Sequence, residues 1–509
     1  MTSIPILSRL PLWKQSPTLP RLAISRRDSP GQRPGLHQLA QDPCLLPRFV
    51  RESPVARRYL DLLGPLAWHE FPERDSLTTW GAPTLPYAPF VAACLIKLDQ
   101  QFAYMSQLRH YLVDHPALVW LLGFPLVPSR DYPWGFDAEA CLPTQRHFAR
   151  LLARVPNANL QFLLDQTVCL VRAEFAANAL TFGQMVALDT KHILAWVKEN
   201  NGKAYIKEGR FAKDNQPAGD PDCRLGCKRR HNQRLPGGDS PPTPHDNPVP
   251  ANTLSIGEFY WGYASGIVAT HLPGWGAFVL AELTQPFDQA DVSYFFPLMA
   301  MAERRLGFRP TFAALDAAFD AAYIYDYFHQ PGQDWTAGFA AIPFSERGGH
   351  GRKQFNAEGL PLCPAGLPMP LKYTFVDRSG LVEHEAGRYA CPLLHPVDTG
   401  QPCPASHKQW AKGGCITTMA TSAGARLRHQ IDRDRELYKQ VYRQRTIAER
   451  IYSQAMALGI ERPRLRNGEA IANQNTLIYV LINLRGLQRV RHKKATQPEQ
   501  DSTDTETTA

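Results

Sequence analysis

The stretch Met185-Val186-Ala187-Leu188-Asp189 is a short apolar run that ends in an acid, and Thr311–Asp316 (Thr-Phe-Ala-Ala-Leu-Asp) is a second of the same kind. Short apolar runs of this length indicate buried β-strands. Open α/β sheets place functional side chains where strands end. The two runs therefore predict a sheet that presents Asp189 and Asp316. Taken singly, each aspartate is also explained as the start of a turn or the cap of a helix.

The chain around these two runs predicts alternating strands and helices. We expect further strands at Phe259–Thr270, Ala277–Leu283 and Gly338–Phe344, and helices at Gln289–Arg305, Ala317–Phe328, Arg433–Leu458 and Thr476–Val490. This order is typical of the α/β class, with a mixed sheet flanked by helices.

Composition shifts divide the chain into six parts. They are a flexible basic arm (1–50), a helical N-terminal domain (51–180), a first part of the α/β core (181–344), a β/loop insertion rich in Gly, Pro and Cys (345–430), the C-terminal helices of the core (431–492) and a polar disordered tail (493–509). Residues 200–252 predict a long loop inside the core, and long loops are usually functional or disordered.

The bulk composition favours a basic protein that works in a reducing compartment. The 509 residues carry a net charge of +9, which suits a polyanionic partner such as nucleic acid. We find no apolar run of about 18 residues and therefore expect no membrane span. The first 30 residues loosely resemble a transit peptide, but their prolines break any amphipathic helix. Ten cysteines without a secretion signal predict free thiols and a cytoplasmic protein.

A third acid is predicted on a late helix. Tyr442, Arg445, Glu449 and Tyr452 are spaced by 3, 4 and 3 residues, which places them on one helical face. An ordinary solvent-exposed Arg–Glu pair would have the same spacing. Three carboxylates are what a pair of Mg²⁺ (or Mn²⁺) ions needs to cleave a phosphodiester, because hard cations prefer oxygen ligands. In that interpretation Arg445 grips a phosphate, and Tyr442 stacks on a base or contacts the backbone.

These motifs resemble the DDE transposases of bacterial insertion sequences, in particular those with a Tyr-x2-Arg-x3-Glu signature. The resemblance covers roughly residues 85–490. It rests on six segments: Ala187-Leu-Asp189-Thr-Lys-His, Asp220–Gly226, Trp261-Gly-Tyr263, Leu315-Asp316-Ala-Ala-Phe319-Asp320, Tyr442–Glu449 and Asn483-Leu-Arg-Gly-Leu487.

The resemblance implies an RNase H-like catalytic domain, a largely β insertion before the last catalytic helix, and a helical N-terminal domain that binds the element's ends. It implies Asp189, Asp316 and Glu449 as the catalytic, metal-binding residues. The partner would be double-stranded DNA at the element's ends and in the target, and the chain would act as a homodimer in the DNA complex, associated with the bacterial nucleoid.

The sequence departs from the family at three places. Met456 stands where the family often has a lysine, and Ala318 replaces a glycine in the second motif. The loop at 200–252 is longer than expected. Asp320 is a rival to Asp316 as metal ligand, but Asp316 directly ends the apolar run and matches the first acid of the motif.

Other residues suggest DNA contacts or a metal. Basic residues that would bind the DNA backbone without reading its sequence lie in two regions: Arg224, Lys228, Arg229, Arg230 and Arg234, then Arg462, Arg464, Arg466, Arg489, Arg491, Lys493 and Lys494. Solubility alone would also explain them. Trp196 and Trp261 are interpreted as core residues rather than base-stacking platforms.

Two sets of cysteines are candidates for a zinc site. Cys363, Cys391, Cys403 and Cys415 lie in the insertion but lack the tight pairs of zinc modules, and the group Cys223, Cys227 and His231 lacks a fourth ligand. The sequence leaves zinc binding open.

Three other functions remain possible from the sequence. The first is an RNase H-like endonuclease that cuts DNA without transposing it. The second is a catalytically inactive DNA-binding protein derived from a transposase. The third is a zinc-stabilised structural protein. The sequence does not indicate the terminal repeat, the target site or the cleavage route.

Overall fold

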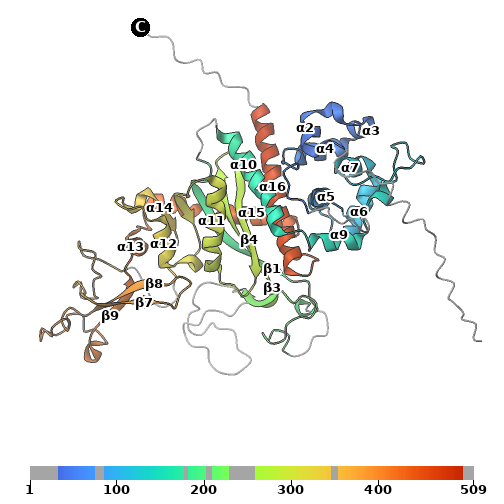
Figure 1. Cartoon of the computed structure of the whole chain (residues 1–509). Helices are drawn as coiled ribbons and strands as arrows, with labels where there is room; N and C mark the ends of the chain where they lie inside the picture. Colours follow the sequence, from blue (N-terminus) through green and yellow to red (C-terminus); the bar gives the residue numbers. More distant parts are fainter. Residues whose placement is uncertain are drawn as a thin grey trace, which may run out of the picture. The chain divides into compact units, whose positions relative to one another are not determined.

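The computed structural model describes residues 33–74, 85–176, 181–201, 209–228, 258–345 and 353–496 (Figure 1). The chain divides into two compact units, Met1–Val155 and Pro156–Ala509, called here the N-terminal and C-terminal units. The sequence predicted this boundary near residue 180, after the helix that continues to Phe175. That helix packs within the C-terminal unit, because its apolar side chains contact the sheet described below.

The N-terminal unit is built from helices. Its described α-helices are α2 (Leu36–Gln41), α3 (Arg48–Arg51), α4 (Pro54–Leu63), α5 (Tyr87–Asp99), α6 (Met105–Asp114), α7 (Pro116–Leu121), α8 (Ala138–Cys141) and α9 (Gln145–Leu152). The flexible arm expected over 1–50 is wrong for its last part. Helix α2 and the buried side chains of Leu39, Leu46 and Val50 belong to the core of this unit. Residues 1–32 lie outside the described part.

A curled mixed sheet forms the centre of the C-terminal unit. Its strands are β1 (Met185–Leu194), β2 (Arg224–Lys228), β3 (Glu258–Leu272), β4 (Gly276–Pro286), β5 (Phe312–Ala314) and β6 (Phe339–Ala341). Strand β1 lies between β3, which is antiparallel to it, and β5, which is parallel to it. Strand β6 continues the sheet parallel to β5, while β2 and β4 pair with successive halves of the long strand β3.

Helices flank this sheet. They are α10 (Asn157–Phe175), α11 (Phe295–Leu306), α12 (Ala322–Phe328), α14 (Glu436–Arg443), α15 (Thr446–Ala457) and α16 (Gly468–Thr496). Helices α10 and α16 run side by side against β4, α11 packs on β3 and β4, α14 on β5 and β6, and α15 on β1 and β3 (Figure 1). The fold is therefore a mixed α/β structure with a helix-flanked sheet, as the sequence predicted at this level.

Helix α11 approaches the sheet closely because Gly266 on β3 has no side chain. A Cβ atom there would lie 2.5 Å from the ring of Tyr294, which directly precedes α11. The Tyr294 hydroxyl donates a 3.0 Å hydrogen bond to the carbonyl of Ala264. Since Gly266 is paired with Thr190, this contact fixes the sheet next to Asp189.

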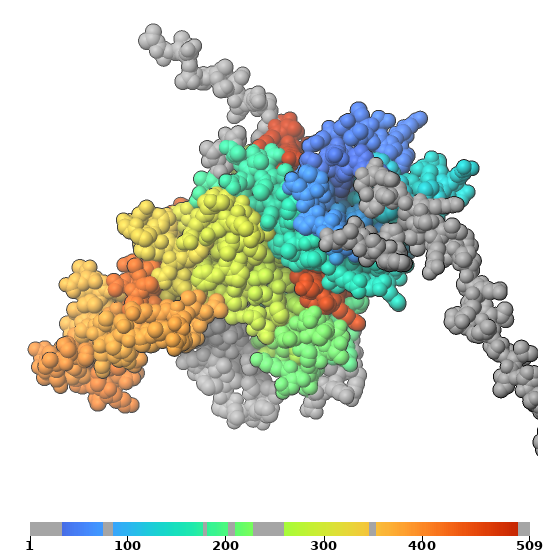
Figure 2. All heavy atoms as spheres, in the orientation of Figure 1, coloured from blue at the N-terminus to red at the C-terminus, as the bar shows by residue number. Residues whose placement is uncertain are grey.

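The insertion forms a small antiparallel sheet of its own. Strands β7 (Leu371–Asp377), β8 (His384–Ala390) and β9 (Ile416–Ala420) pair in the order β7-β8-β9, followed by helix α13 (Ala423–Gln430). In Figure 2 this segment, coloured orange, is a lobe beside the yellow part of the core. Its helix α13 packs against α12 of the core.

The long helix expected over Arg433–Leu458 is wrong, since the structure has two helices there. Helix α14 ends at Arg443, and α15 begins after Arg445, which is its N-cap residue. The two helices pack on different strands, and each needs apolar residues on the side that faces the sheet. The helical spacing of apolar residues in the sequence therefore continues across the break. In the described residues no helix is long and apolar enough to cross a membrane.

Candidate functional site

The sequence predicted that Asp189 ends its strand, and this is wrong because β1 continues to Leu194. Asp316 lies two residues past the end of β5, in the turn that follows it. Ala187 on β1 is paired with Ala314 on β5, and each aspartate follows its alanine by two residues. Both side chains are partly exposed, whereas the apolar residues before them, Leu188 and Leu315, are buried. The sheet therefore brings two carboxylates from positions more than a hundred residues apart in sequence to one edge of the fold.

The Asp189 carboxyl group holds its proton unusually strongly. Burial raises its pKa to about 7, and the nearby carboxylates of Asp316 and Asp291 act in the same direction. A 2.8 Å hydrogen bond from the Thr190 amide and the positive charge of Arg445 oppose this rise. Raised carboxyl pKa values of this kind occur at functional sites, where acids share one region.

Asp316 and its rival Asp320 have different surroundings. Asp316 caps the turn that follows it by accepting a 2.8 Å hydrogen bond from the Ala318 amide. The Asp320 side chain is fully buried, and its two oxygens accept bonds from Arg428 at 2.7 and 2.5 Å. Asp320 also accepts bonds from the Tyr325 hydroxyl and the Ser345 amide. Asp320 is thus used as a structural ion-pair partner, which leaves Asp316 as the candidate ligand.

Glu449 lies on α15, the helix that packs on the two central strands. The buried hydroxyl of Tyr452, one turn after Glu449, is 2.6 Å from the carbonyl oxygen of Asp189 and 3.0 Å from that of Ser265. This contact ties the helix to β1 at the residue that carries the first acid. The single helical face expected for Tyr442, Arg445, Glu449 and Tyr452 is wrong, because Tyr442 lies on α14 whereas Glu449 and Tyr452 lie on α15.

Arg445 and Glu449 form an ion pair of 2.6 Å at the start of α15. Their side chains are 30% and 49% exposed. Burial lowers the pKa of Arg445, but Glu449, Tyr442 and Asp189 outweigh it and raise the pKa overall. Arg445 therefore lies in the electrostatic field of both acids, Asp189 and Glu449.

The donor chemistry of the three acids suits a hard divalent cation, which prefers oxygen ligands. Asp189 and Asp316 interact electrostatically, and a cation would reverse the rise in the Asp189 pKa. As the side chains lie, no three His, Cys, Asp or Glu residues within the described ranges form a group that could hold a metal ion. Glu449 is bound to Arg445. The oxygen donors of Asp189 and Asp316 are of the type that a hard cation takes, and Glu449 would join them only after leaving Arg445.

The residues expected to bind DNA have different outcomes. Tyr442 is partly buried, and its ring stacks on Tyr438 with centroids 6.0 Å apart. Arg229, Arg230, Arg234 and His231 lie outside the described residues. Arg491 and Lys494 pair with Glu174, so these two cations have partners within the chain.

One tryptophan differs from expectation. Trp261 is buried as predicted, with its indole N–H bonded to the carbonyl of Arg210 at 2.9 Å. Trp196 is 48% exposed, and the guanidinium of Arg466 lies 5.4 Å from its ring centroid. The core assignment of Trp196 is wrong, because the strand before it ends at Leu194 and its side chain lies at the surface.

Sequence reasoning missed Asp291. Its Oδ1 accepts a 2.7 Å hydrogen bond from the hydroxyl of Thr190, next to Asp189, and its charge contributes to the Asp189 pKa. No motif surrounds Asp291. Only the packing of the segment before α11 onto β1 brings it here.

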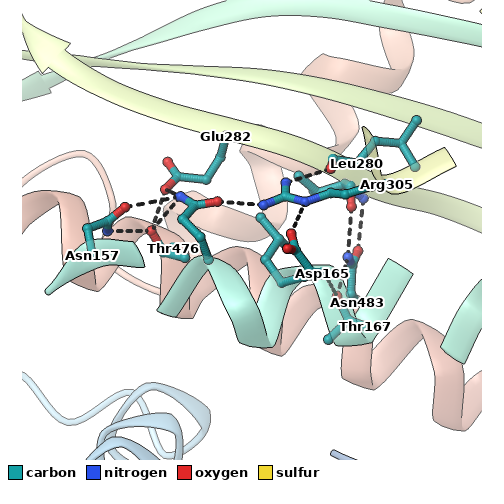
Figure 3. Close-up of polar contacts among 11 residues, drawn as sticks. Asn157, Asp165, Thr167, Leu280, Glu282, Arg305, Thr476 and Asn483 are labelled. Carbon is teal, nitrogen blue, oxygen red and sulfur yellow. Dashed lines mark hydrogen bonds and ion pairs between the residues drawn. The ribbon is translucent and has the colours of Figure 1, made fainter. Parts of the chain in front are cut away.

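A second polar cluster lies two strands across the sheet from Asp189, between α10, β4, α11 and α16 (Figure 3). The buried Glu282 on β4 accepts hydrogen bonds from Gln161 at 2.8 Å and from Thr476. The buried guanidinium of Arg305 forms an ion pair with Asp165 and donates a 2.7 Å bond to the carbonyl of Leu280. These bonds join three helices to one strand.

No protein-family model and no curated protein matches this chain. Its function is therefore inferred from the candidate site alone.

Proposed function

We propose that this protein is a DNA transposase of the DDE type, which cleaves the ends of an insertion sequence and joins them to target DNA. The observation that carries the proposal is the register of β1 and β5, which sets Asp189 and Asp316 side by side while Tyr452 docks the Glu449 helix onto β1. Ordinary capping or turn aspartates need no such convergence from three separate segments.

The sheet topology supports an RNase H-like core. In this sheet β3 is antiparallel to β1, β5 is parallel to β1, β6 is parallel to β5, and β2 and β4 both pair with β3. Such a mixed sheet flanked by helices is what the resemblance implies. The insertion of mainly β structure between the second aspartate and the glutamate also agrees with the resemblance. The net charge of +9 suits a DNA partner.

The proposed roles of the residues follow from their positions. Asp189 and Asp316 would hold Mg²⁺ or Mn²⁺, with Glu449 completing a two-ion site. When bound, the ions supply an activated nucleophile and stabilise the leaving oxygen of the phosphodiester. Arg445 would bind a phosphate near the scissile bond, since its guanidinium is partly exposed and already faces a carboxylate. A phosphate at Arg445 would compete with Glu449 and so free this carboxylate for the site. As in the resembling family, the DNA complex would contain a homodimer.

The direct test incubates the purified full-length chain with labelled DNA that carries the sequences flanking its own gene, in Mg²⁺ or in EDTA. We expect metal-dependent nicking at the ends and strand-transfer products. Asp189→Asn, Asp316→Asn and Glu449→Gln should abolish both. Two matched controls should keep both activities: Glu282→Gln replaces another buried acid, and Glu436→Gln replaces another exposed glutamate paired with an arginine.

Other outcomes would identify the alternatives. Nicking without strand transfer would indicate an endonuclease. Specific binding of the ends without nicking by the wild-type chain would indicate an inactive DNA-binding derivative. Nicking that survives Glu449→Gln would remove the third ligand and the helix motif on which the transposase assignment depends.

A further inference from the structure

Three cysteines of the insertion meet in its small apolar core, although 28 and 24 residues separate them successively in sequence (363 to 391, and 391 to 415). Cys391 and Cys415 are buried together with Met369, Tyr389 and Leu393, and the partly buried Cys363 packs against this cluster. Gly414 comes so close to Cys391 that a Cβ atom there would lie 3.1 Å from the thiol sulfur. The sequence grouped these thiols only by their common place in the insertion, because they form no tight pairs.

A repeated local geometry presents the thiols. Cys363, Cys391 and Cys403 are each followed by proline, and the carbonyl of each accepts a hydrogen bond from the amide three residues later, at 2.8, 3.2 and 3.1 Å. Proline at the second position is typical of such β-turns, because its fixed φ matches the turn. Cys415 instead follows Gly413 and Gly414, both with positive φ. The insertion therefore uses four tight backbone bends, each next to a cysteine.

The apolar cluster of the insertion is small. Among the described residues it has five buried members, two of which are cysteines, and six partly buried side chains pack against it. Small modules of this kind are usually stabilised by disulfides or by a structural metal. All the described cysteines are free thiols, and a reducing compartment favours a metal over a disulfide.

We propose that Cys363, Cys391, Cys403 and Cys415 bind one structural zinc ion that holds the insertion together. Cys363, Cys391 and Cys415 are the three ligands of the apolar cluster. Cys403, half-buried on the segment between Cys391 and Cys415, is the fourth. The thiols as they lie are not yet gathered around one point, so zinc binding draws the Cys403 turn inward and rotates the other side chains.

The chemistry of the cluster favours a soft cation. Each sulfur–zinc bond forms as one S–H bond breaks, so four bound thiolates release four protons to the solvent. A divalent cation would stabilise thiolates that lie together in an apolar cluster, because its charge offsets their burial and their mutual repulsion.

The test measures zinc in the full-length chain, purified without chelators, by elemental mass spectrometry. We expect about one zinc ion per chain. Cys391→Ser, Cys415→Ser and Cys363→Ser should lower it to background, and Cys403→Ser should weaken retention against a chelator at least about tenfold. Cys44→Ser and Cys169→Ser, which alter exposed thiols elsewhere, are the matched controls and should keep the ion. The double variant Asp189→Asn and Glu449→Gln should also keep it, which separates this site from the acidic one.

A second measurement covers variants that fail to fold. Replacement of zinc by Co²⁺ in the wild-type chain should give a sulfur-to-metal charge-transfer band and the visible spectrum of a tetrahedral thiolate site. Wild-type protein with zinc at background and no such spectrum on adding Co²⁺ would overturn the proposal. Unchanged retention in Cys403→Ser would overturn the four-thiol site. Neither measurement uses DNA, so these results are independent of any transposase activity.

Discussion

Asp189 and Glu282 are two acids on neighbouring parts of one sheet, and burial raises the pKa of each to about 7. Their surroundings differ. Hydrogen bonds from Thr476, Gln161 and Thr284 surround Glu282 and lower its pKa in part. Asp189 has one amide donor and two further acids nearby, Asp316 and Asp291.

The comparison teaches that a raised pKa alone does not distinguish a functional acid from a structural one. Glu282 is almost completely buried, at 1% exposure, and its donors come from helices that it helps to fix. Asp189 is partly exposed and faces like charges, which a fold maintains only at a cost. We therefore expect substitutions at Asp189 to affect activity and substitutions around Glu282 to affect stability.

The largest expected effect is on DNA cleavage. Asp189→Asn keeps the shape of the side chain but removes the charge, so cleavage should fall on the order of 10³-fold or more, about 4 kcal/mol of transition-state stabilisation. Glu282→Gln should leave the rate within about threefold, less than 0.7 kcal/mol. Single-turnover cleavage rates measure both. Equal losses in the two variants would contradict the distinction between the acids.

The next effect concerns the free energy of unfolding. Substitutions in the cluster around Glu282 should change it more than substitutions at Asp189. Arg305→Met should lower the free energy of unfolding by about 2–3 kcal/mol, because it removes the buried guanidinium that pairs with the partly exposed Asp165 and leaves the carbonyl of Leu280 without this donor. Urea unfolding measures the loss. Asp165→Asn is the milder companion and should cost less, since its side chain is 35% exposed. A change below about 1 kcal/mol in Arg305→Met would show that the network is not structural.

The pH dependence of protein stability gives a third test of Asp189. The folded pKa of Asp189 lies above its ordinary value of 3.8. Its contribution to stability is therefore fully present below about pH 4 and is lost as the pH rises through about 7. In metal-free buffer, Asp189→Asn should raise the melting temperature by roughly 2–4 °C near pH 8 and leave it unchanged near pH 4.

Thermal unfolding of the wild type and the variant across this pH range provides the measurement. Asp334→Asn is the control, because Asp334 lies at the surface and its pKa is lowered from the ordinary value rather than raised. An equal gain for Asp189→Asn at both pH values would mean that the carboxyl pKa is not raised.

The smallest expected effect is the contribution of the Arg445–Glu449 ion pair to the free energy of unfolding. Both side chains are partly exposed, so Arg445→Met should change the free energy of unfolding by less than about 1 kcal/mol. Its cleavage rate should fall on the order of 10²-fold if Arg445 binds a phosphate. Urea unfolding and cleavage assays on the same preparation test the pair. A large loss of stability would assign Arg445 to the fold instead.

Much of the fold could be predicted from the sequence because strand and helix patterns are local. The runs before Asp189 and Asp316 form β1 and β5, and the late apolar pattern forms helices. The break at Arg445 could not be predicted, since both helices keep apolar residues where the pattern requires them. It depends on α14 packing on β5 and β6 while α15 packs on β1 and β3.

The site was predicted in part for the same reason. The two acids that follow the apolar runs could be found from the local pattern, whereas the choice between Asp316 and Asp320 depends on Arg428, which lies 108 residues after Asp320. The exposure of Trp196 and the pairing of Arg491 with Glu174 likewise depend on residues distant in sequence.

By itself the sequence determined the alternation of buried strands and amphipathic helices, and the acid that follows each of two apolar runs, because side-chain periodicity acts within a few residues. Only the tertiary structure decided which side chains meet. The register of β1 against β5 joined Asp189 to Asp316, and Tyr452 placed the Glu449 helix beside them. Three cysteines came together in the insertion. The physical reason is that burial and charge depend on neighbours in space, which the packing of distant segments sets and no local pattern contains.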